Sequence, residues 1–428
     1  MSAQVDVVKS IFQMSNPQER IYFDYRVSRL GTAYNVPFLA DITGISTEII
    51  DQLLHKLISV NEMLRSCFMV INGDLSRVSY DMVDFDIEFF SVPNLDEVDF
   101  RQYLKNFDLK NPPLFRFSIF EDSKHKKYLL FDAHHILFDG YSACLIQKDM
   151  ENLLLSKDLD ERCPYDCYVQ HEKSFIRSPE YQKLREYWLR RLDGADFLSP
   201  FPVIDENSEG ERNNWIKRSI RPEDCEVFKK LALKYKTTQF NFYLSMLYLT
   251  VGFETGKKDL IFVTPTLNRS KKIFLQTIGL FINIIPFRNS YNDDNTVSDF
   301  LKQVSKNSFA DLGNQYFQFN DLVSALRMEH TQNKTPNFSL YFDFEDEFNK
   351  KKFTKDLGFD LRRSKYDVDF VIAKRNGFFD IDVSFRPFIS ANDIENIMER
   401  FFNILNLLKY NSTAMEMTIE DFQKSTQE

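Results

Sequence analysis

The stretch AHHILFDGYS, residues 133–142, decides how the rest of this chain is interpreted. It overlaps the end of an apolar, strand-like segment, KKYLLFDA (126–133), and contains two adjacent histidines, an aspartate and a glycine. The whole chain has only six histidines, and two of them stand here side by side. Because histidine changes charge near neutral pH, it is often the side chain that moves protons in catalysis. The stretch therefore indicates a candidate catalytic site at the end of a strand.

The spacing of the polar residues in this stretch suggests different roles for them. In an extended segment successive side chains point to opposite faces, so His134 and His135 cannot both enter one pocket. One of them would act and the other would support it. Asp139 could orient an imidazole or pair with an arginine, and Gly140 lets the backbone turn without a side chain in the way. Ser142 could then cap a helix that runs through CLIQKDMENLLL.

The predicted order of strand, histidines, turn and helix start has chemical consequences. A helix N-terminus beside a histidine disfavours protonation of the imidazole and offers backbone N–H groups to a developing oxyanion. Two other interpretations are open at this stage, a satisfied structural turn and a pair of metal ligands. A metal site is disfavoured, because adjacent histidine side chains diverge and no second cluster of ligands accompanies them.

Length and composition limit the class of protein. The 428 residues suggest two or three domains, or two similar halves around one cleft, and 43% of the residues are hydrophobic. The formal net charge of −9 argues against nucleic acid as the main partner. A cytoplasmic protein is expected, because no apolar stretch approaches the roughly 18 residues of a membrane span and no signal-peptide pattern opens the chain. The five cysteines form an odd set without metal spacing and are expected to be reduced thiols.

Hydrophobic periodicity predicts helices and strands in both halves of the chain. STEIIDQLLHKLISVN (46–61) is an amphipathic helix that Ser46 or Thr47 can cap, and further helices are expected within 161–193, 237–253, 297–312 and 390–410. The polar stretch 205–214 is the predicted exposed connection. The fold class is therefore α/β, with two α/β sandwiches and a site between them. The predicted strands are VPFLADI, SCFMVI, SRVSYD, IEFFSV, FRFSIF, KYLLFDA, DLIFVTP, FINIIPFR, NFSLYFDF, DVDFVIA and GFFDIDVSF.

Several motifs, in order along the chain, resemble those of condensation domains of nonribosomal peptide synthetases, within the chloramphenicol-acetyltransferase-like superfamily. HHILFDG (134–140) fits the HHxxxDG signature of that family at every defined position. SNPQERIYF (15–23) is similar to its opening S-x-A-Q-x-R motif, and NEMLRSCF (61–68) resembles R-H-E-x-L-R-T-x-F. TPTLNRS (264–270) and IGLFINIIPFR (278–288) resemble the segment that ends in I-G-x-F-V-N-T. The matches run from residue 15 to about 410, so the resemblance covers nearly the whole chain.

Some positions depart from the family pattern. Pro17 stands in place of an alanine, Val60 and Asn61 replace a basic pair, Ala133 replaces a methionine, and Ile284 replaces a threonine. NQYFQFNDL and TPNFSLYF match later motifs more loosely, and in the family those motifs shape the substrate tunnel and the carrier contacts. The resemblance therefore specifies the chemistry better than the substrate.

The resemblance assigns roles to individual residues. His135 would face the tunnel and act on the attacking amine, while His134 would support the site. Asp139 would be structural and would pair with Arg65 of the second motif. Three further residues complete the implied site, namely Gly140 as a support of the histidines and Asn283 and Ser339 as residues that line the tunnel.

The resemblance also implies an architecture and a reaction. Two acetyltransferase-like subdomains, residues 1–175 and 176–428, would form a V-shaped pseudo-dimer with the active site in a tunnel between them. The reaction would join an acyl or peptidyl thioester to an amine and form an amide. No cofactor would be bound by this chain, because its substrates would arrive on the phosphopantetheine of partner carrier proteins. A monomer is expected, with no nucleic-acid or membrane partner.

The origin of the carriers follows from two missing motifs. The sequence has no nucleotide-binding Gly-rich loop and no G-G-x-S phosphopantetheine attachment site. The donor and acceptor carriers would therefore act in trans or belong to a longer synthetase. The acceptor amine could be carrier-bound or free.

Two alternative functions stay open at this stage. One is a coenzyme A-dependent or ester-forming acyltransferase of the same superfamily. The other is a non-catalytic recruitment domain, although relatives of that kind usually have a degraded histidine motif. Epimerisation is disfavoured because an E-G-H-G-R-E-like motif is missing from the sequence, and heterocyclisation because the histidines are intact.

Overall fold

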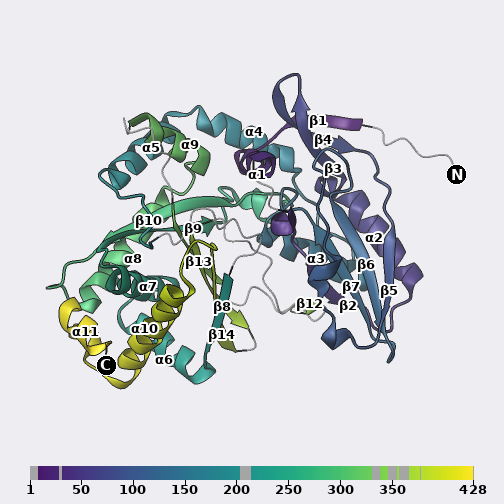
Figure 1. Cartoon of the computed structure of the whole chain (residues 1–428). Helices are drawn as coiled ribbons and strands as arrows, with labels where there is room; N and C mark the ends of the chain where they lie inside the picture. Colours follow the sequence, from purple (N-terminus) through teal and green to yellow (C-terminus); the bar gives the residue numbers. More distant parts are fainter. Residues whose placement is uncertain are drawn as a thin grey trace. The chain divides into compact units, whose positions relative to one another are not determined.

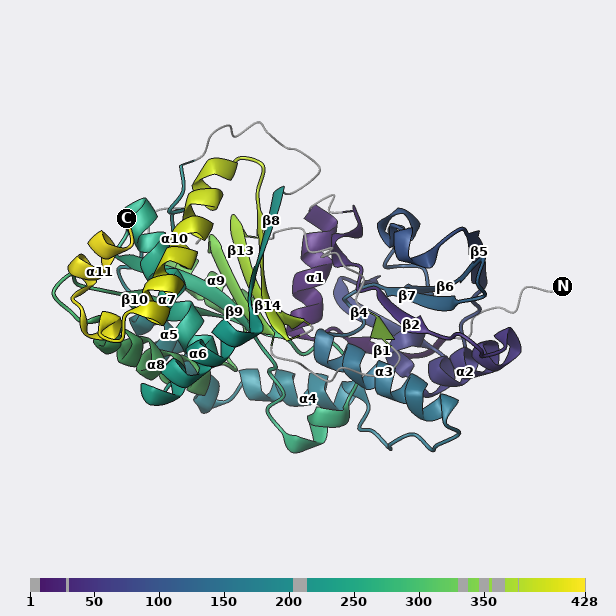
Figure 2. The same ribbon diagram turned by 90° about the horizontal axis from the view of Figure 1, so that it is seen from below.

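The computed structural model of the chain describes residues 8–27, 31–202, 214–329, 338–345, 354–355, 366–375 and 377–427 (Figures 1 and 2). Its contacts divide the chain into two compact units. The first comprises Met1–Tyr181, Leu267–Ile282 and Asn349–Arg362, and the second comprises Gln182–Thr266, Asn283–Phe348 and Arg363–Glu428. This division differs from the predicted boundary after residue 175, because two later segments belong to the first unit. The predicted connection 205–214 lies outside the described residues except for Asn214.

In the described part of the first unit, the strands form two sheets. The smaller is antiparallel, in the order β1 (Val8–Gln13), β4 (Asp74–Tyr80) and β3 (Ser66–Ile71). The larger has the order β12-β2-β7-β6-β5, in which β5 and β6 are parallel and the other neighbours are antiparallel. Its strands are β12 (Thr354–Lys355), β2 (Phe38–Asp41), β7 (Lys127–Ala133), β6 (Phe115–Asp122) and β5 (Ile87–Val92).

Four helices accompany these sheets, and α2 confirms a prediction in detail. The hydroxyl of Ser46 caps α2 by accepting a hydrogen bond from the N–H of Ile49 (3.4 Å). The apolar face of α2 packs with α3 into the same core as the aromatic side chains of β6 and β7. The helices are α1 (Asn16–Val27), α2 (Thr47–Val60), α3 (Gly140–Leu154) and α4 (Tyr165–Ile176).

A six-stranded sheet forms the centre of the second unit. Its order is β10-β9-β11-β13-β14-β8, in which β11 is parallel to β9 and β13 and the other neighbours are antiparallel. α7 is buried over most of its length, as its nearly unbroken apolar sequence predicts, and it packs with α8 and α10 beside the sheet (Figure 2). The strands are β8 (Asn214–Ile220), β9 (Asp259–Thr266), β10 (Asn283–Ser290), β11 (Leu340–Glu345), β13 (Val368–Arg375) and β14 (Phe378–Phe385).

The remaining helices complete the second unit and the connections. α5 (Pro179–Leu192) begins in the first unit and continues into the second. The others are α6 (Pro222–Lys234), α7 (Gln239–Thr255), α8 (Val297–Gly313), α9 (Phe319–Glu329), α10 (Ala391–Tyr410) and α11 (Ile419–Ser425). Short 3-10 helices lie at Gly31–Tyr34, Glu62–Arg65, Leu95–Glu97, Phe100–Tyr103, Lys272–Gln276 and Ala414–Glu416.

Two expectations from composition can be compared with the structure. Among the described residues, no helix combines the length and the apolar character that crossing a bilayer requires. The five cysteines are free thiols, as expected.

Candidate active site at the histidine loop

The histidine loop, residues 134–139, connects the end of β7 to the start of α3. Backbone hydrogen bonds fix its first two residues. The N–H of His134 donates to the carbonyl of Leu114 (2.9 Å), and the N–H of His135 donates to the carbonyl of Tyr34 (2.7 Å). The predicted order of strand, histidines, turn and helix start is therefore confirmed.

The start of α3 differs from the prediction in its cap. Asp139 is the N-cap, and its Oδ1 accepts from the N–H of Ser142 (2.8 Å). The prediction that Ser142 caps the helix is wrong, because its hydroxyl donates to the carbonyl of Gly279 (2.8 Å). A side chain at Gly140 would meet no atom within 4 Å at its Cβ position. The turn would therefore also accommodate a larger side chain at position 140. The glycine instead leaves open space beside the loop.

His135 is held in one tautomer by its backbone neighbour. Its Nδ1 lies 2.9 Å from the carbonyl oxygen of Phe138. A carbonyl oxygen can only accept, so Nδ1 carries the proton. In the neutral ring the lone pair is then on Nε2, the position that can accept a proton. The side chain is partly exposed.

His134 has the opposite tautomer and a different environment. It is 3% exposed, and its Nδ1 accepts from the N–H of Ile136 (3.1 Å), so Nδ1 is unprotonated and the ring is neutral. Three aromatic rings surround it, with centroid distances of 5.7 Å to Tyr34 and 6.2 Å to Tyr25 and Phe107. These contacts fit the supporting role that the sequence predicts for His134.

A buried ion pair holds the C-terminal end of the loop. The guanidinium of Arg269 lies 3.1 Å and 3.4 Å from the two carboxylate oxygens of Asp139, and both side chains are almost fully buried. The N–H of Phe281 also donates to Asp139 (3.1 Å). Arg269 further donates to the Ser142 hydroxyl (2.7 Å) and to the carbonyls of Phe274 (2.5 Å) and Thr277 (2.7 Å). Segment 267–282 is therefore attached to the loop through the Arg269 side chain and through hydrogen bonds of the Gly279 and Phe281 backbone.

Arg65 does not pair with Asp139, so that prediction is wrong. Its guanidinium donates to the carbonyls of Ile58 (2.6 Å), Ser59 and Tyr80 (3.1 Å). The carbonyls at the end of α2 lack partners within the helix and attract a cation. Arg65 therefore joins the end of α2 to β4, and burial lowers the pKa of its guanidinium.

The first motif supports the loop from its other side. The N–H of Ser15 donates to the side chain of Gln18 (3.2 Å), and the N–H of Gln18 donates to the Ser15 hydroxyl (3.3 Å), which forms a capping box at the start of α1. The Gln18 amide also donates to the carbonyl of Ile136 in the histidine loop (3.4 Å). The motif therefore starts a helix and holds the loop with the same residues.

Gly279 permits a close contact with Tyr165. A Cβ at this position would lie 2.0 Å from a ring carbon of Tyr165, so any side chain would clash. The Tyr165 hydroxyl donates to the carbonyl of Leu280 and lies 2.7 Å from the Ser15 hydroxyl. Because the Tyr165 hydroxyl donates its proton to the Leu280 carbonyl, the Ser15 hydroxyl is the donor in its hydrogen bond with the Tyr165 oxygen. One buried tyrosine therefore links three segments that are far apart in the sequence.

Comparison with known proteins identifies the family. The condensation domain model matches residues 8–427. The chain belongs to the condensation domain family. Bacitracin synthase 3 of Bacillus licheniformis is 25% identical over 411 residues, which are 93% of this chain and 6% of that protein. Surfactin synthase subunit 1 of Bacillus subtilis (strain 168) is 24% identical over 379 residues, which are 86% of this chain and 10% of that protein. The chain thus spans only a small part of these relatives.

Solved structures agree on the fold. The chain aligns over 98% of its length with holo-AB3403, a four-domain nonribosomal peptide synthetase bound to AMP and glycine, with a TM-score of 0.86, 18% identity and 34% of that chain covered. The predicted mixed α/β, chloramphenicol-acetyltransferase-like fold is therefore confirmed. Condensation domains of such synthetases are acyltransferases that form amide bonds. The comparisons support neither alternative function, the coenzyme A-dependent or ester-forming acyltransferase or the recruitment domain.

The two predicted tunnel residues of the condensation domain lie in its second unit. The amide of Asn283 donates to the carbonyls of Gln315 and Phe317 (both 2.8 Å) and accepts from the N–H of Phe319 (3.1 Å). These bonds join the start of β10 to the connection between α8 and α9. They give Asn283 a structural role, and its tunnel-lining role stays a prediction.

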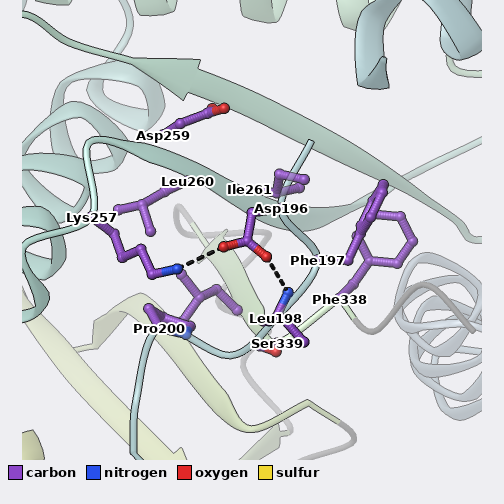
Figure 3. Close-up of a pocket in the computed structure, with 11 residues that line it drawn as sticks. Asp196, Phe197, Leu198, Pro200, Lys257, Asp259, Leu260, Ile261, Phe338 and Ser339 are labelled. Carbon is purple, nitrogen blue, oxygen red and sulfur yellow. Dashed lines mark hydrogen bonds and ion pairs between the residues drawn. The ribbon is translucent and has the colours of Figure 1, made fainter. Parts of the chain in front are cut away.

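Ser339 borders a small pocket at the edge of β9 and β11 (Figure 3). The carboxylate of Asp196 in this pocket accepts from the Lys257 ammonium (2.6 Å) and from the N–H of Leu198 (3.0 Å). The pocket volume of about 20 Å³ is close to that of a single water. This pocket is too small for a substrate, and a tunnel-lining role for Ser339 also stays a prediction.

Arg269 is the site residue that sequence reasoning missed. It lies in TPTLNRS, which was matched to the family without a role for the arginine. Asp139 and Arg269 are 130 residues apart, so no local pattern connects them. Among the described residues, no group of three or more His, Cys, Asp or Glu side chains could hold a metal ion.

Proposed function

We propose that this chain forms an amide bond between an acyl or peptidyl thioester on a carrier protein and an amine acceptor, with His135 as the catalytic residue. The observation that carries the proposal is the orientation of His135, whose Nδ1 donates to the Phe138 carbonyl (2.9 Å). That bond presents Nε2 as the basic nitrogen of a partly exposed ring. The second histidine of an HHxxxDG motif thereby has the form that a general base requires.

The reaction needs a proton acceptor at one step. The amine nitrogen attacks the thioester carbonyl carbon and gives a tetrahedral adduct, in which the nitrogen is strongly acidic. Nε2 of His135 accepts that proton, the carbon–sulfur bond breaks, and the proton passes to the departing thiolate. General base catalysis of this kind contributes about 10²- to 10⁴-fold to a rate. The thioester is already activated, so no covalent enzyme intermediate is required.

The groups around His135 contribute position and space. The buried Asp139–Arg269 pair (3.1 Å) holds the loop against segment 267–282, so Asp139 is a positioning residue. Open space at the Cβ position of Gly140 lies at the start of α3, where N–H groups at the helix N-terminus favour developing negative charge. Substitution at Gly140 would fill that space.

The substrates and partners follow from the family. Condensation domains work with carrier domains within synthetase modules, and the carriers of such modules present substrates on phosphopantetheine. We therefore propose that this chain binds no cofactor of its own. Donor and acceptor carriers act in trans or as parts of a longer synthetase.

Product mass spectrometry tests the proposal. A carrier loaded with an acyl donor is mixed with the chain and a panel of free and carrier-bound amines, and the amide products are identified. We expect His135→Ala to lower the rate by about 10²- to 10⁴-fold. The control is His125→Ala, which alters an exposed histidine before the start of β7, at the opposite end of that strand from the loop, and should leave the rate unchanged.

Three results would contradict the proposal. An undiminished rate for His135→Ala would exclude His135 as the base. Equal or better use of acyl-coenzyme A than of the loaded carrier would favour a coenzyme A-dependent acyltransferase. Binding of carriers without any amide or ester product would favour a recruitment domain.

A further inference from the structure

A second buried aspartate lies just before the histidine loop. Asp132, the penultimate residue of β7, is 2% exposed. Its Oδ2 accepts a hydrogen bond from the side-chain amide of Asn35 (2.8 Å). The nearest cation is the guanidinium of Arg116 on β6, whose Nη1 lies 3.7 Å from the same oxygen. Asp132 therefore lacks the close ion pair that Asp139 has.

Asn35 belongs to a short segment that runs along the histidines. The N–H of Val36 donates to the carbonyl of Ala133 (2.7 Å), and Asn35 forms an antiparallel bridge with His134. Together with the bond from His135 to Tyr34, these contacts pair segment 34–36 with residues 133–135 through backbone hydrogen bonds and an isolated bridge. The Asn35 amide also donates to the carbonyl of Lys105 (3.1 Å), which ties a third segment to the pair.

Two buried oxygens in this pair have no hydrogen-bond partner among the described residues. They are Oδ1 of Asp132 and Oδ1 of Asn35. As the amide nitrogen of Asn35 already donates to Oδ2 of Asp132, the two side chains face one another. A proton on Oδ1 of Asp132 would let the acid donate to the amide oxygen and would satisfy both atoms at once.

We propose that Asp132 and Asn35 form a neutral acid–amide pair with two reciprocal hydrogen bonds, and that this pair positions His135. Both are positioning residues, because they act on the loop through the paired segment 34–36 and not on the substrate. The expected effect of this pair on the condensation rate rests on the proposed function. The protonation state of Asp132 is independent of that function, because it can be measured even in a chain without activity.

The surroundings of the pair favour the neutral acid. Burial raises the pKa of Asp132 to about 7, while the hydrogen bond from Asn35 and the charge of Arg116 oppose this rise. Arg116 is occupied by the carbonyls of Lys105 (2.8 Å) and Asn106 (2.7 Å) and stacks on Phe107. The other nearby charged or titratable groups are Glu88 on β5, which pairs with the ammonium of Lys105 (2.8 Å), and the neutral His134.

Two substitutions at Asp132 separate the hydrogen bonds from the charge. Asp132→Asn retains a reciprocal pair with Asn35, so we expect the condensation rate to stay within about twofold of the wild type at pH 6.5. Asp132→Ala removes the pair, and a displaced base costs about 10- to 100-fold in rate with the KM values little changed. Asp122→Ala, at the opposite end of β6 and β7, is the matched control and should lower stability without changing the rate of the folded fraction.

The pH dependence of stability and rate tests whether Asp132 carries a proton. A carboxyl whose pKa is raised on folding binds its proton more tightly in the folded state, so stability is greatest at low pH. The stability of the wild type relative to Asp132→Asn should therefore fall as the pH rises from about 4 to about 7, and then stay level. The ratio of wild-type to Asp132→Asn rates should fall above pH 7. The infrared difference between the wild type and Asp132→Asn should contain, below pH 7, the carbonyl band of the protonated acid at position 132.

Three outcomes would overturn the inference. An ionised Asp132 at pH 6 in the infrared spectrum would exclude the neutral pair, whatever the activity. Equal rate losses for Asp132→Asn and Asp132→Ala would show that the charge is required. An Asp132→Ala variant with a normal rate per folded molecule would remove the positioning role and leave a structural one.

Discussion

The two ends of the histidine loop hold buried aspartates in different ways. Asp139, after the histidines, lies 3.1 Å from the guanidinium of Arg269 and accepts from two backbone N–H groups. Asp132, before the histidines, has only an amide at 2.8 Å and a guanidinium at 3.7 Å. Both carboxyls are 2% exposed, so burial alone does not distinguish them.

The comparison shows that the partner decides the charge of a buried carboxyl. A cation and N–H donors favour the ionised form, whereas burial with an incomplete set of donors favours the protonated form. The ionised side of the loop can tie a distant segment by charge. The neutral side can only use directional hydrogen bonds. The histidines therefore lie between a strong attachment by charge and a weaker attachment by hydrogen bonds, and both attachments join segments far apart in the sequence.

Removing Arg269, the cation that pairs with Asp139, should have the largest effect on stability. Arg269→Ala leaves the Asp139 carboxylate buried without its ion pair, which costs about 3 to 5 kcal/mol of unfolding free energy. Urea unfolding measures the loss. The double variant Asp139→Ala/Arg269→Ala should lose less than the sum of the single variants, because no unpaired charge is left.

A second ion pair, between Asp149 on α3 and Arg162 in the connection from α3 to α4, offers a matched control. Asp149 and Arg162 form two hydrogen bonds (2.5 Å and 2.6 Å), and both residues lie outside the histidine loop and segment 267–282. Asp149→Ala should lower stability to a similar extent and leave the rate of the folded fraction unchanged. If Asp149→Ala lowers the rate of the folded fraction as much as Asp139→Ala does, the ion pair at the histidine loop has no particular role in positioning His135.

Crowding at Gly279 should have an intermediate effect. Gly279→Ala forces a Cβ to within 2.0 Å of the Tyr165 ring, so segment 267–282 must shift away from the loop. Overpacking of this kind costs about 1 to 3 kcal/mol, which thermal unfolding can detect. Gly313→Ala is the control, because its Cβ would meet no atom within 4 Å. A Gly279→Ala substitution without cost would contradict the contact, and so would an equal cost in a Tyr165→Ala background, which lacks the ring.

Another buried carboxyl without a close cation should give the smallest effect. Glu172 accepts from the N–H of Asn16 (2.8 Å) and from the hydroxyl of Tyr168 (2.8 Å), and burial raises its pKa to about 7. Like Asp132, it should lower stability as the pH rises from about 4 to about 7. Glu172→Gln should reduce this decline by about 1 to 2 kcal/mol in urea unfolding at pH 5 and pH 8. An unchanged pH dependence would show that Glu172 is ionised throughout.

Much of the secondary structure was predictable, because local patterns specify it. The apolar alternation and length of IEFFSV correspond to β5 (Ile87–Val92), and the helical spacing of 46–61 corresponds to α2 (Thr47–Val60). The cap of α3 was predicted one turn too late, because Asp139 and Ser142 are both suitable cap residues. Only the backbone at the helix start decides between them.

The sequence by itself determined the histidine motif, the order of the elements around it and the family, since all of these are properties of neighbouring residues or of ordered motifs. Tertiary structure alone decided which arginine pairs with Asp139. Arg65 and Arg269 have the same side chain, but the first is used by carbonyls at the end of α2 and the second is brought to the loop from 130 residues away. The contrast between Asp132 and Asp139 likewise depends on donors from other segments. Charge states in a protein interior are set by such long-range neighbours, and no local pattern encodes them.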